Sequence, residues 1–510
     1  MRLKQSVLNA KVSTIMYTFT ILIGFISQSV FLKTLGEEYL GLNGLFSNII
    51  SVLSIVELGF GTAIVYNLYQ PLYEDNKEKV KSIIAYYKKI YRIIALIVFS
   101  LGIGVLPFLK IIVGEVSVDE NIQLIFFLYL MDTVASYLLT YKRSILYADQ
   151  KVYLTNIVHI GYLILMNGLQ ILDLLLINSF IIYLLIKISC RILENIIITI
   201  VANNKYPYLK ERNISKLSSE FRSEIITKVK GLLLHQIGSA FILGTDNIII
   251  SMAPGLGVVS VGLYSNYNLI IMAVYNVVTQ TFSSITAGVA NLLVENNSRK
   301  SYEIYKNMLL LNSWIFSFVA ISVLSLIEPF IILWIGSEYL LSKFVLIVLV
   351  IDLYIRGMRN SSSVFKNAAG IFYEDRYVPL IESAINLIFS IIFVRYFGLA
   401  GVFMGTIMSS MVLFGYSYPK YVYKGIFKKN YLQYSRDYLQ YIFITMLSAI
   451  VVYFVTETVK VNNPFVQLFI NGMICLIFPN LIYYLFFHKT DEYKYCKNIV
   501  MQLFGKFKRK

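Results

Sequence analysis

The chain alternates between long apolar runs and short polar segments from one end to the other. Each run is long enough to cross the roughly 30 Å hydrocarbon core of a bilayer as a helix of about 20 residues. The pattern therefore predicts an all-α polytopic membrane protein. Its fourteen expected spans lie approximately at 12–32, 42–67, 83–107, 121–143, 154–175, 177–200, 229–252, 260–288, 307–333, 343–362, 378–396, 400–417, 438–456 and 465–487.

The basic residues fall mostly on one side of this alternation. The side that holds the N-terminus receives 38 of the 45 Lys and Arg residues, and the opposite side receives five. Cytoplasmic loops of membrane proteins carry an excess of Lys and Arg. The sequence therefore predicts that both termini are cytoplasmic, which requires an even number of spans.

Composition agrees with this class and excludes others. The chain is 57% hydrophobic and 15% charged, whereas soluble domains are about 25% charged. The net charge of +16 is concentrated in short loops that set topology, so no nucleic-acid partner is expected. The Cys and His residues are scattered without metal-ligand spacing, and no Walker motif is present. We therefore predict no catalytic residue, metal site or cofactor.

The sequence contains an internal repeat at an offset of 221 residues. Six spans separate the two copies, so both insert with the same orientation, as in secondary transporters built from two parallel repeats. This predicts two six-helix lobes around a central cavity. The matched pairs are Gly41 with Gly262, Leu72 with Leu293, Glu74 with Glu295, Asn76 with Asn297, Lys79 with Lys300, Ala148 with Ala369 and, after one inserted residue, Gly114 with Gly336.

The repeat defines the expected domain organisation. The N-terminal lobe covers 1–201 and the C-terminal lobe covers 229–420, and a basic cytoplasmic linker at 202–228 joins them. The last two spans, at 438–487, lie outside the repeat, and a basic cytoplasmic tail follows at 488–510.

Two segments carry a resemblance to a known group. The segments "LGEEYLGLNGLFSNIISVLSIVELGFGTAIVYNLYQPL" (35–72) and "GTDNIIISMAPGLGVVSVGLYSNYN" (244–268) resemble the lobe-opening signatures of the multidrug/oligosaccharidyl-lipid/polysaccharide (MOP) flippase superfamily. Within it, the sequence is most similar to the Wzx-type polysaccharide flippases. The resemblance covers the first twelve spans at least.

This resemblance implies a function and a location. It implies a flippase of the bacterial cytoplasmic membrane that moves an undecaprenyl-diphosphate-linked oligosaccharide to the outer leaflet by alternating access. The polymer would be of the capsule, exopolysaccharide, O-antigen or teichoic-acid type, and membrane lipids and other polysaccharide-assembly proteins would be its partners. Lipid II flippases of the superfamily carry cavity arginines on their first, second and eighth spans, and here these spans contain none.

Carboxylates inside the spans are the candidates for ion coupling or gating, because an ionisable group at mid-membrane costs about 2.5–3.5 kcal/mol on insertion scales. The repeat places Val278 opposite Glu57 and Phe25 opposite Asp246, so the shared fold does not require these two. Coupling to Na⁺ or H⁺ and hydrogen bonding within one lobe both stay open for them. Asp132 falls within one residue of the position of Asp352, which favours an interhelical structural bond over coupling.

Cations inside the spans are the candidates for binding a lipid diphosphate, which needs cationic hydrogen-bonding partners when it leaves water. Lys187 and Arg191 share one face of a span, and Glu194 lies close enough to neutralise Arg191. Arg356 and Arg359 share a face at a cytoplasmic helix end. The alternative for all four cations is an anchoring or snorkelling role.

Two other functions remain as alternatives. A cation-coupled drug exporter, such as those of the MATE branch, would have the same two lobes around a different cavity. A membrane-embedded polysaccharide polymerase or ligase would require a sizeable outer loop with catalytic residues, and every outer loop here is short.

Overall fold

The computed structural model describes residues 2–57, 60–211, 214–295 and 297–507 of the chain. These residues form helices and connecting turns, with no strand among them. Contacts divide the chain into two compact units, unit 1 (Met1–Gly262) and unit 2 (Leu263–Lys510). The prediction of an all-α polytopic membrane protein is confirmed.

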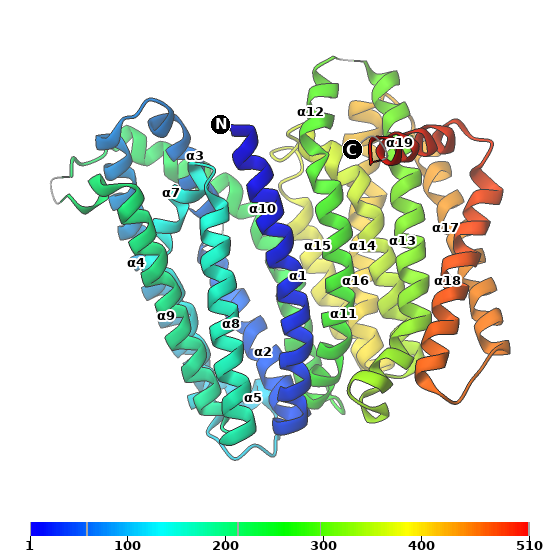
Figure 1. Ribbon diagram of the computed structural model, residues 1–510, viewed down its shortest axis with the longest axis horizontal. Coiled ribbons are helices and arrows are strands. Elements are labelled where there is room, and N and C mark those ends of the chain that lie inside the picture. The colour runs from blue at the N-terminus through cyan, green and yellow to red at the C-terminus, as the bar shows by residue number, and fades with distance from the viewer. Residues whose placement is uncertain (1, 58–59, 212–213, 296, 508–510) are drawn as a thin grey trace. The chain divides into compact units, whose positions relative to one another are not determined.

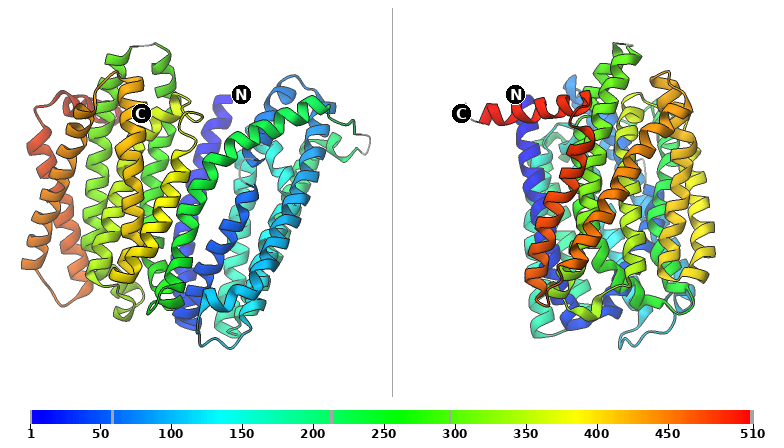
Figure 2. Two further views of the ribbon diagram at one scale, coloured as in Figure 1. Left: turned by 180° about the vertical axis from the view of Figure 1, so that it is seen from behind. Right: turned by 90° about the vertical axis from the view of Figure 1, so that its right-hand side faces the viewer.

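Unit 1 contains ten α-helices and the start of an eleventh among its described residues, together with short 3₁₀ helices (Figures 1 and 2). They are α1 (Arg2–Leu35), α2 (Glu37–Leu53), α3 (Phe60–Tyr73), α4 (Lys77–Val105), α5 (Leu109–Val113), α6 (Ile122–Leu139), α7 (Arg143–Ala148), α8 (Val152–Leu176), α9 (Phe180–Lys205), α10 (Ser219–Met252) and α11 (Gly257–Ser284). The helices that pack on each other most extensively are α1 with α8, α8 with α9, α4 with α6 and α6 with α9.

Unit 2 holds the rest of α11 and the remaining helices. They are α12 (Thr286–Val294), α13 (Ser298–Trp334), α14 (Lys343–Ala368), α15 (Val378–Phe397), α16 (Leu399–Val412), the π-helix η6 (Leu413–Ile426), α17 (Tyr431–Thr458), α18 (Pro464–Phe487) and α19 (Asp491–Phe507). The bundle helices run side by side, and α19 lies across their ends (Figures 1 and 2).

Each of the fourteen predicted spans coincides with a helix or a run of helices. Eleven helices in the described part of the chain are long and apolar enough to cross a membrane. The other three predicted spans are α9, α10 and α14. Charged side chains inside α9 and α14 reduce their apolar character, and these are the charges that the sequence singles out for function.

The structure repeats local details as well as helix order. Asn76 caps α4 by accepting a hydrogen bond from the Lys79 amide at 3.0 Å, and Asn297 caps α13 in the same way from Lys300 at 3.0 Å. Gly114 and Gly336 both adopt positive φ, 72° and 124°, a conformation that glycine reaches without penalty. These pairs are the ones that the sequence repeat aligns.

A close approach between α2 and the start of α11 explains one shared feature of the repeat. A Cβ atom on Gly41 would lie 2.0 Å from the backbone oxygen of Val258, and one on Gly262 would lie 2.3 Å from the backbone oxygen of Glu37. Backbone atoms cannot give way as flexible side chains can. Both repeat-related positions are therefore restricted to glycine by the same contact.

Some boundaries differ from those predicted. Helix α10 begins at Ser219 inside the predicted linker, and it packs against α2 in unit 1. The predicted tail forms α19, which docks on α13 through a Lys306–Glu492 ion pair and a stack of Trp314 on Tyr493. Residues 212–213 of the linker and 508–510 of the tail lie outside the described part of the chain. The lobe boundaries at 201 and 229 stay a prediction.

The glycine contact gives a direct stability test. Replacing Gly41 with Ala should lower stability by about 1–3 kcal/mol, because the new methyl group overpacks a rigid backbone contact. The control is Gly161→Ala on α8, where a Cβ would meet nothing within 4 Å and where Ala is the better helix former by about 0.5–1 kcal/mol. Thermal unfolding of the purified proteins in detergent measures both. Equal stability of the two variants would contradict the close contact.

Candidate functional site

Six charged or titratable side chains converge in unit 1 from four helices. They are Asp132 on α6, Arg143 at the start of α7, His159 on α8, and Lys187, Arg191 and Glu194 on α9. We call these six residues the ion cluster. The spacing along α9 places its three members on one face, and helix packing brings the other three to that face.

Glu194 is the centre of the ion cluster. Its Oε1 atom lies 3.0 Å from Arg143 Nη2 and 2.9 Å from His159 Nδ1, and its Oε2 atom lies 3.0 Å from Arg191 Nη1. The carboxylate has no exposed surface. A buried carboxylate is tolerated only when it is paired and hydrogen-bonded, and three donors meet that requirement here.

Asp132 makes the longer contacts of the ion cluster. Its oxygens lie 3.6 Å from Lys187 Nζ and 3.5 Å from Arg191 Nε, which are ion-pair distances beyond the usual hydrogen-bond range. Two aromatic rings support the same cations. Lys187 lies over the ring of Tyr129 at 4.8 Å, and Arg191 lies over the ring of Tyr162 at 4.6 Å.

The ion cluster carries an excess of positive charge. Lys187, Arg191 and Arg143 oppose only two carboxylates, and a neutral His159 leaves this balance unchanged. Each of the three cations keeps about a quarter of its side chain exposed, 24%, 24% and 25%. The Nε atoms of Arg143 and Arg191 make no hydrogen bond to the described residues. These two Nε atoms are buried, so an anionic oxygen ligand could reach only the exposed parts of the three cations.

Glu57 and Asp246 lie on other elements of unit 1 than the ion cluster. Glu57 ends a 3₁₀ segment, Ser54–Glu57, between α2 and α3. Its Oε1 atom accepts a 3.1 Å hydrogen bond from the hydroxyl of Tyr91, which is fully buried on α4. Asp246 lies half-buried on α10. The predicted carboxylates thus occupy different elements of unit 1.

Unit 2 holds Arg356 and Arg359 in separate ion pairs. Arg356 pairs with Asp352 one turn away on α14. Arg359 lies 2.7 Å from the carboxylate of Glu382 on α15 and also donates to Ser410 on α16. Both arginines are therefore engaged within unit 2, so a role in receiving a diphosphate stays a prediction for them.

A third pair in unit 2 joins one cation to one carboxylate in the same way. Lys366 pairs with Asp375, whose other oxygen accepts a 3.0 Å hydrogen bond from Ser417. The three cations Arg356, Arg359 and Lys366 thus face the three carboxylates Asp352, Glu382 and Asp375. The buried clusters of the two units differ in net charge, because the ion cluster of unit 1 has one cation more than it has carboxylates.

Sequence reasoning missed part of the ion cluster. Arg143 follows its span at a cytoplasmic helix end, and His159 is isolated in the sequence, yet both contact Glu194. No short spacing in the sequence links residues 143, 159 and 194, because α7, α8 and α9 bring them together only in the folded unit. By contrast, the pairing of Arg191 with Glu194 follows from their spacing and is confirmed.

The central carboxylate makes a stability prediction. Glu194→Gln keeps the shape but leaves Arg143 and Arg191 short of a counter-ion, so we expect a loss of about 3–5 kcal/mol. The control is Glu303→Gln, because Glu303 pairs with Arg299 on an exposed surface, with 61% of the side chain accessible, and such pairs contribute little. Thermal unfolding in detergent compares the two. A Glu194→Gln protein as stable as the control would refute the central role of this carboxylate.

Comparisons by sequence give no relative. No protein-family model matches the chain, and no curated protein matches it.

Comparisons by structure do find neighbours. The lipid II flippase MurJ, in an inward closed conformation, is 16% identical over 93% of this chain and 98% of its own, with a TM-score of 0.63. An inward-facing multidrug resistance MATE family transporter of the MOP superfamily is 16% identical over 77% of this chain and 91% of its own, with a TM-score of 0.60. A mutant form of the MATE transporter VcmN of Vibrio cholerae is 14% identical over 81% of this chain and 96% of its own, with a TM-score of 0.54. The chain therefore has the fold shared by the MATE transporters and by the lipid II flippase MurJ.

Proposed function

We propose that this protein is a flippase that moves a diphosphate-linked oligosaccharide lipid from the inner to the outer leaflet of a bacterial cytoplasmic membrane. The main observation that supports this proposal is the net positive charge of the ion cluster, in which Lys187, Arg191 and Arg143 face two carboxylates. A diphosphate that leaves water needs charge-assisted hydrogen bonds, and Lys and Arg supply them. The expected products are polymers of the capsule, exopolysaccharide, O-antigen or teichoic-acid type.

Lys187 is the proposed first contact for the diphosphate. Its contact with Asp132 is 3.6 Å long, so this ion pair is weaker than the three close contacts of Glu194. An incoming phosphate can replace Asp132 as the partner of the ammonium group without uncovering Glu194. Arg191 is the second proposed contact, because 24% of its side chain is exposed and its ion pair with Asp132 is also long, at 3.5 Å.

The fold likeness supports a flippase over a drug exporter. The match to MurJ covers 93% of the chain. Residues 427–510 make up about a sixth of the chain, which is more than the part that this match leaves uncovered. That match must therefore include part of the two helices after the repeat. The match to the MATE transporter covers 77% and does not require them. Two helices beyond the twelve-span repeat thus fit the flippase arrangement better.

The substrate is proposed to differ from lipid II. The spans that contain α1, α2 with α3, and α11 hold no arginine between residues 12 and 67 or between 260 and 288. Lipid II flippases, which the sequence resembles as members of the same superfamily, carry cavity arginines on these spans. The cationic partners of the diphosphate are instead proposed to come from α7 and α9.

The second candidate function is a cation-coupled drug exporter. The fold likeness to the MATE transporters favours it, and the carboxylates Glu57 and Asp246 would serve as coupling groups. A cationic drug, however, would be repelled by the net positive ion cluster. A membrane enzyme is disfavoured by the short outer loops and by the fold, which resembles that of transporters.

The substrate assignment predicts a loss of transport in Lys187→Ala. The variant removes one charge-assisted hydrogen bond, so we expect transport to fall about tenfold or more. The assay follows a fluorescent polyprenyl-diphosphate oligosaccharide as it moves between the leaflets of vesicles that contain the purified protein.

Two controls separate this effect from misfolding and from charge loss alone. Lys187→Arg keeps the cation and should retain most transport, and Lys89→Ala removes an exposed lysine of α4 and should transport normally. Wild-type transport by Lys187→Ala would refute its role. No transport by the unmodified protein, with transport of a cationic dye instead, would favour the exporter.

Coupling by Glu57 makes a separate prediction. If Glu57 carries the coupling ion, Glu57→Gln should remove the stimulation of transport by an imposed Na⁺ or H⁺ gradient and leave the rate without a gradient unchanged. Tyr91→Phe removes the hydrogen bond to this carboxylate and is the matched control. A purely structural role would instead give both variants the same loss of thermal stability and an unaltered response to the gradient.

A further inference from the structure

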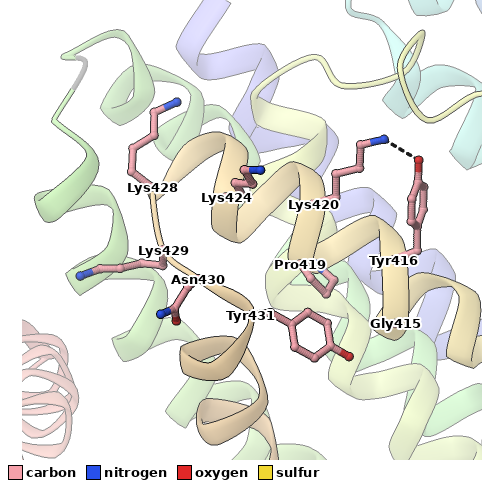
Figure 3. A pocket seen from close by; sticks show the side chains of 9 residues that line it. All are labelled: Gly415, Tyr416, Pro419, Lys420, Lys424, Lys428, Lys429, Asn430 and Tyr431. Atoms are coloured by element: carbon pink, nitrogen blue, oxygen red, sulfur yellow. Dashed lines mark hydrogen bonds between the residues drawn. The ribbon is translucent and has the colours of Figure 1, made fainter.

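A groove lined by lysines lies in unit 2 where η6 joins α17 (Figure 3). Its volume is about 800 Å³. The residues that give it its character are Lys420, Lys424, Lys428, Lys429, Tyr416 and Tyr431. No carboxylate is among the described residues that line it. We call this space the lysine groove.

The four lysines of the lysine groove lack acidic partners. Lys420 contacts the hydroxyl of Tyr416, Lys428 donates to the carbonyl of Gly425 at 2.8 Å, and Lys429 lies over the ring of Tyr302 at 5.0 Å. None of the four forms an ion pair with a carboxylate in the part of the chain that is described. The buried cations of the same unit, on α14, are all paired. The lysine groove is thus a local concentration of uncompensated positive charge.

The backbone holds these lysines in place. The wider turns of the π-helix carry Lys420 and Lys424, four residues apart, along one side of η6. Lys428 adopts a left-handed φ of 58°, a conformation that ends the helix. The Lys429 amide then donates to the Tyr423 carbonyl at 2.9 Å. The turn therefore places Lys428 and Lys429 beside the last turns of η6. Figure 3 shows the four lysines along this segment, with Lys420 directed toward Tyr416 and Lys429 directed away from it.

An apolar groove of about 300 Å³ adjoins the lysine groove. It runs between α14, the α16–η6 helix and α17, and no charged residue is among the described residues that line it. Gly415 and Tyr431 line both grooves, so the two spaces meet at these residues. Met358, Leu439 and Ser435 lie along the apolar groove.

We propose that the two grooves together bind an anionic phospholipid, with the phosphate among the lysines and an acyl chain in the apolar groove. Four uncompensated cations match a phosphate headgroup, and an adjoining charge-free groove matches a hydrocarbon chain. Basic pockets at the cytoplasmic ends of membrane helices are suited to anionic headgroups. The positive-inside pattern puts the junction of η6 and α17 on the cytoplasmic side, so the lipid comes from the inner leaflet.

A topological role alone does not account for this geometry. Lysines that only set orientation can be scattered over loops, whereas these four border one concave space that continues into an apolar groove. A soluble phosphate compound would use the lysines but not the apolar groove. The combination requires a ligand that is anionic at one end and apolar at the other. This inference does not depend on the proposed transport function.

The headgroup part is tested by native mass spectrometry of the full-length protein with dioleoyl phosphatidylglycerol, using dioleoyl phosphatidylcholine as the neutral comparison. A variant with Lys420, Lys424, Lys428 and Lys429 changed to Gln should lose preferential binding of phosphatidylglycerol. Each lysine near a headgroup contributes about fivefold in affinity, so Lys424→Gln alone should weaken binding by that factor if the fourfold variant does not fold.

The matched control for the headgroup test removes the same number of charges from unit 1. It changes Lys77, Lys79, Lys88 and Lys89 of α4 to Gln, because these side chains are at least partly exposed. The control should keep its preference for phosphatidylglycerol. Equal losses in the control and in the groove variant would overturn the proposal.

The chain part is tested by Ser435→Trp, which fills the apolar groove with an indole ring. This variant should weaken binding of phosphatidylglycerol while binding of glycerol phosphate, the soluble headgroup probe, stays unchanged. Two results would refute a lipid site. One is glycerol phosphate binding as tightly as the lipid, which would indicate a free-phosphate site, and the other is unaltered lipid binding by Ser435→Trp. Thermal unfolding of each variant excludes a general loss of structure as the cause.

Discussion

The burial of the Glu194 carboxylate among three donors governs the organisation of unit 1. An unpaired charge inside a membrane protein is expensive, and Glu194 has no exposed surface. Its partners come from α7, α8 and its own helix α9, so one carboxylate links helices that also pack on one another. Asp132 extends the constraint to α6 through Lys187 and Arg191. The electrostatics of the unit thus follow from its packing, because the same contacts make three cations share two carboxylates.

Sequence periodicity predicts the helices well because a spanning helix is a local requirement of about 20 apolar residues. The repeat can also be detected in the sequence, because its matched residues have local roles. Asn76 and Asn297 act as helix caps, and Gly41 and Gly262 face backbone atoms. The sequence predicts only part of the ion cluster. The spacing of Arg191 and Glu194 on one helix gives their contact directly. The contacts of Arg143 and His159 with Glu194 depend on which faces of three helices meet, and no spacing along the chain records that.

The two units treat the repeat-related aspartates differently. Asp352 pairs with Arg356 on its own helix, whereas Asp132 reaches cations on a neighbouring helix. The repeat places Met408 and Val412 opposite Lys187 and Arg191. In that part of α16, unit 2 instead supplies Ser410 as a hydrogen-bond partner for Arg359. An aspartate paired with a cation is therefore common to both units, and the additional positive charge is specific to unit 1.

This difference supports the proposal that the charge of the ion cluster serves function rather than packing. In unit 2 the three cations Arg356, Arg359 and Lys366, whose side chains are 18%, 20% and 8% exposed, each meet one carboxylate in a short contact. In unit 1 three cations share two carboxylates, and each cation keeps about a quarter of its side chain exposed. A site that must attract an anion requires this kind of imbalance, because a neutralised cluster would offer an incoming phosphate no net attraction. The asymmetry between two units of one repeat thus favours anion recognition in unit 1 and leaves unit 2 with balanced ion pairs in its interior.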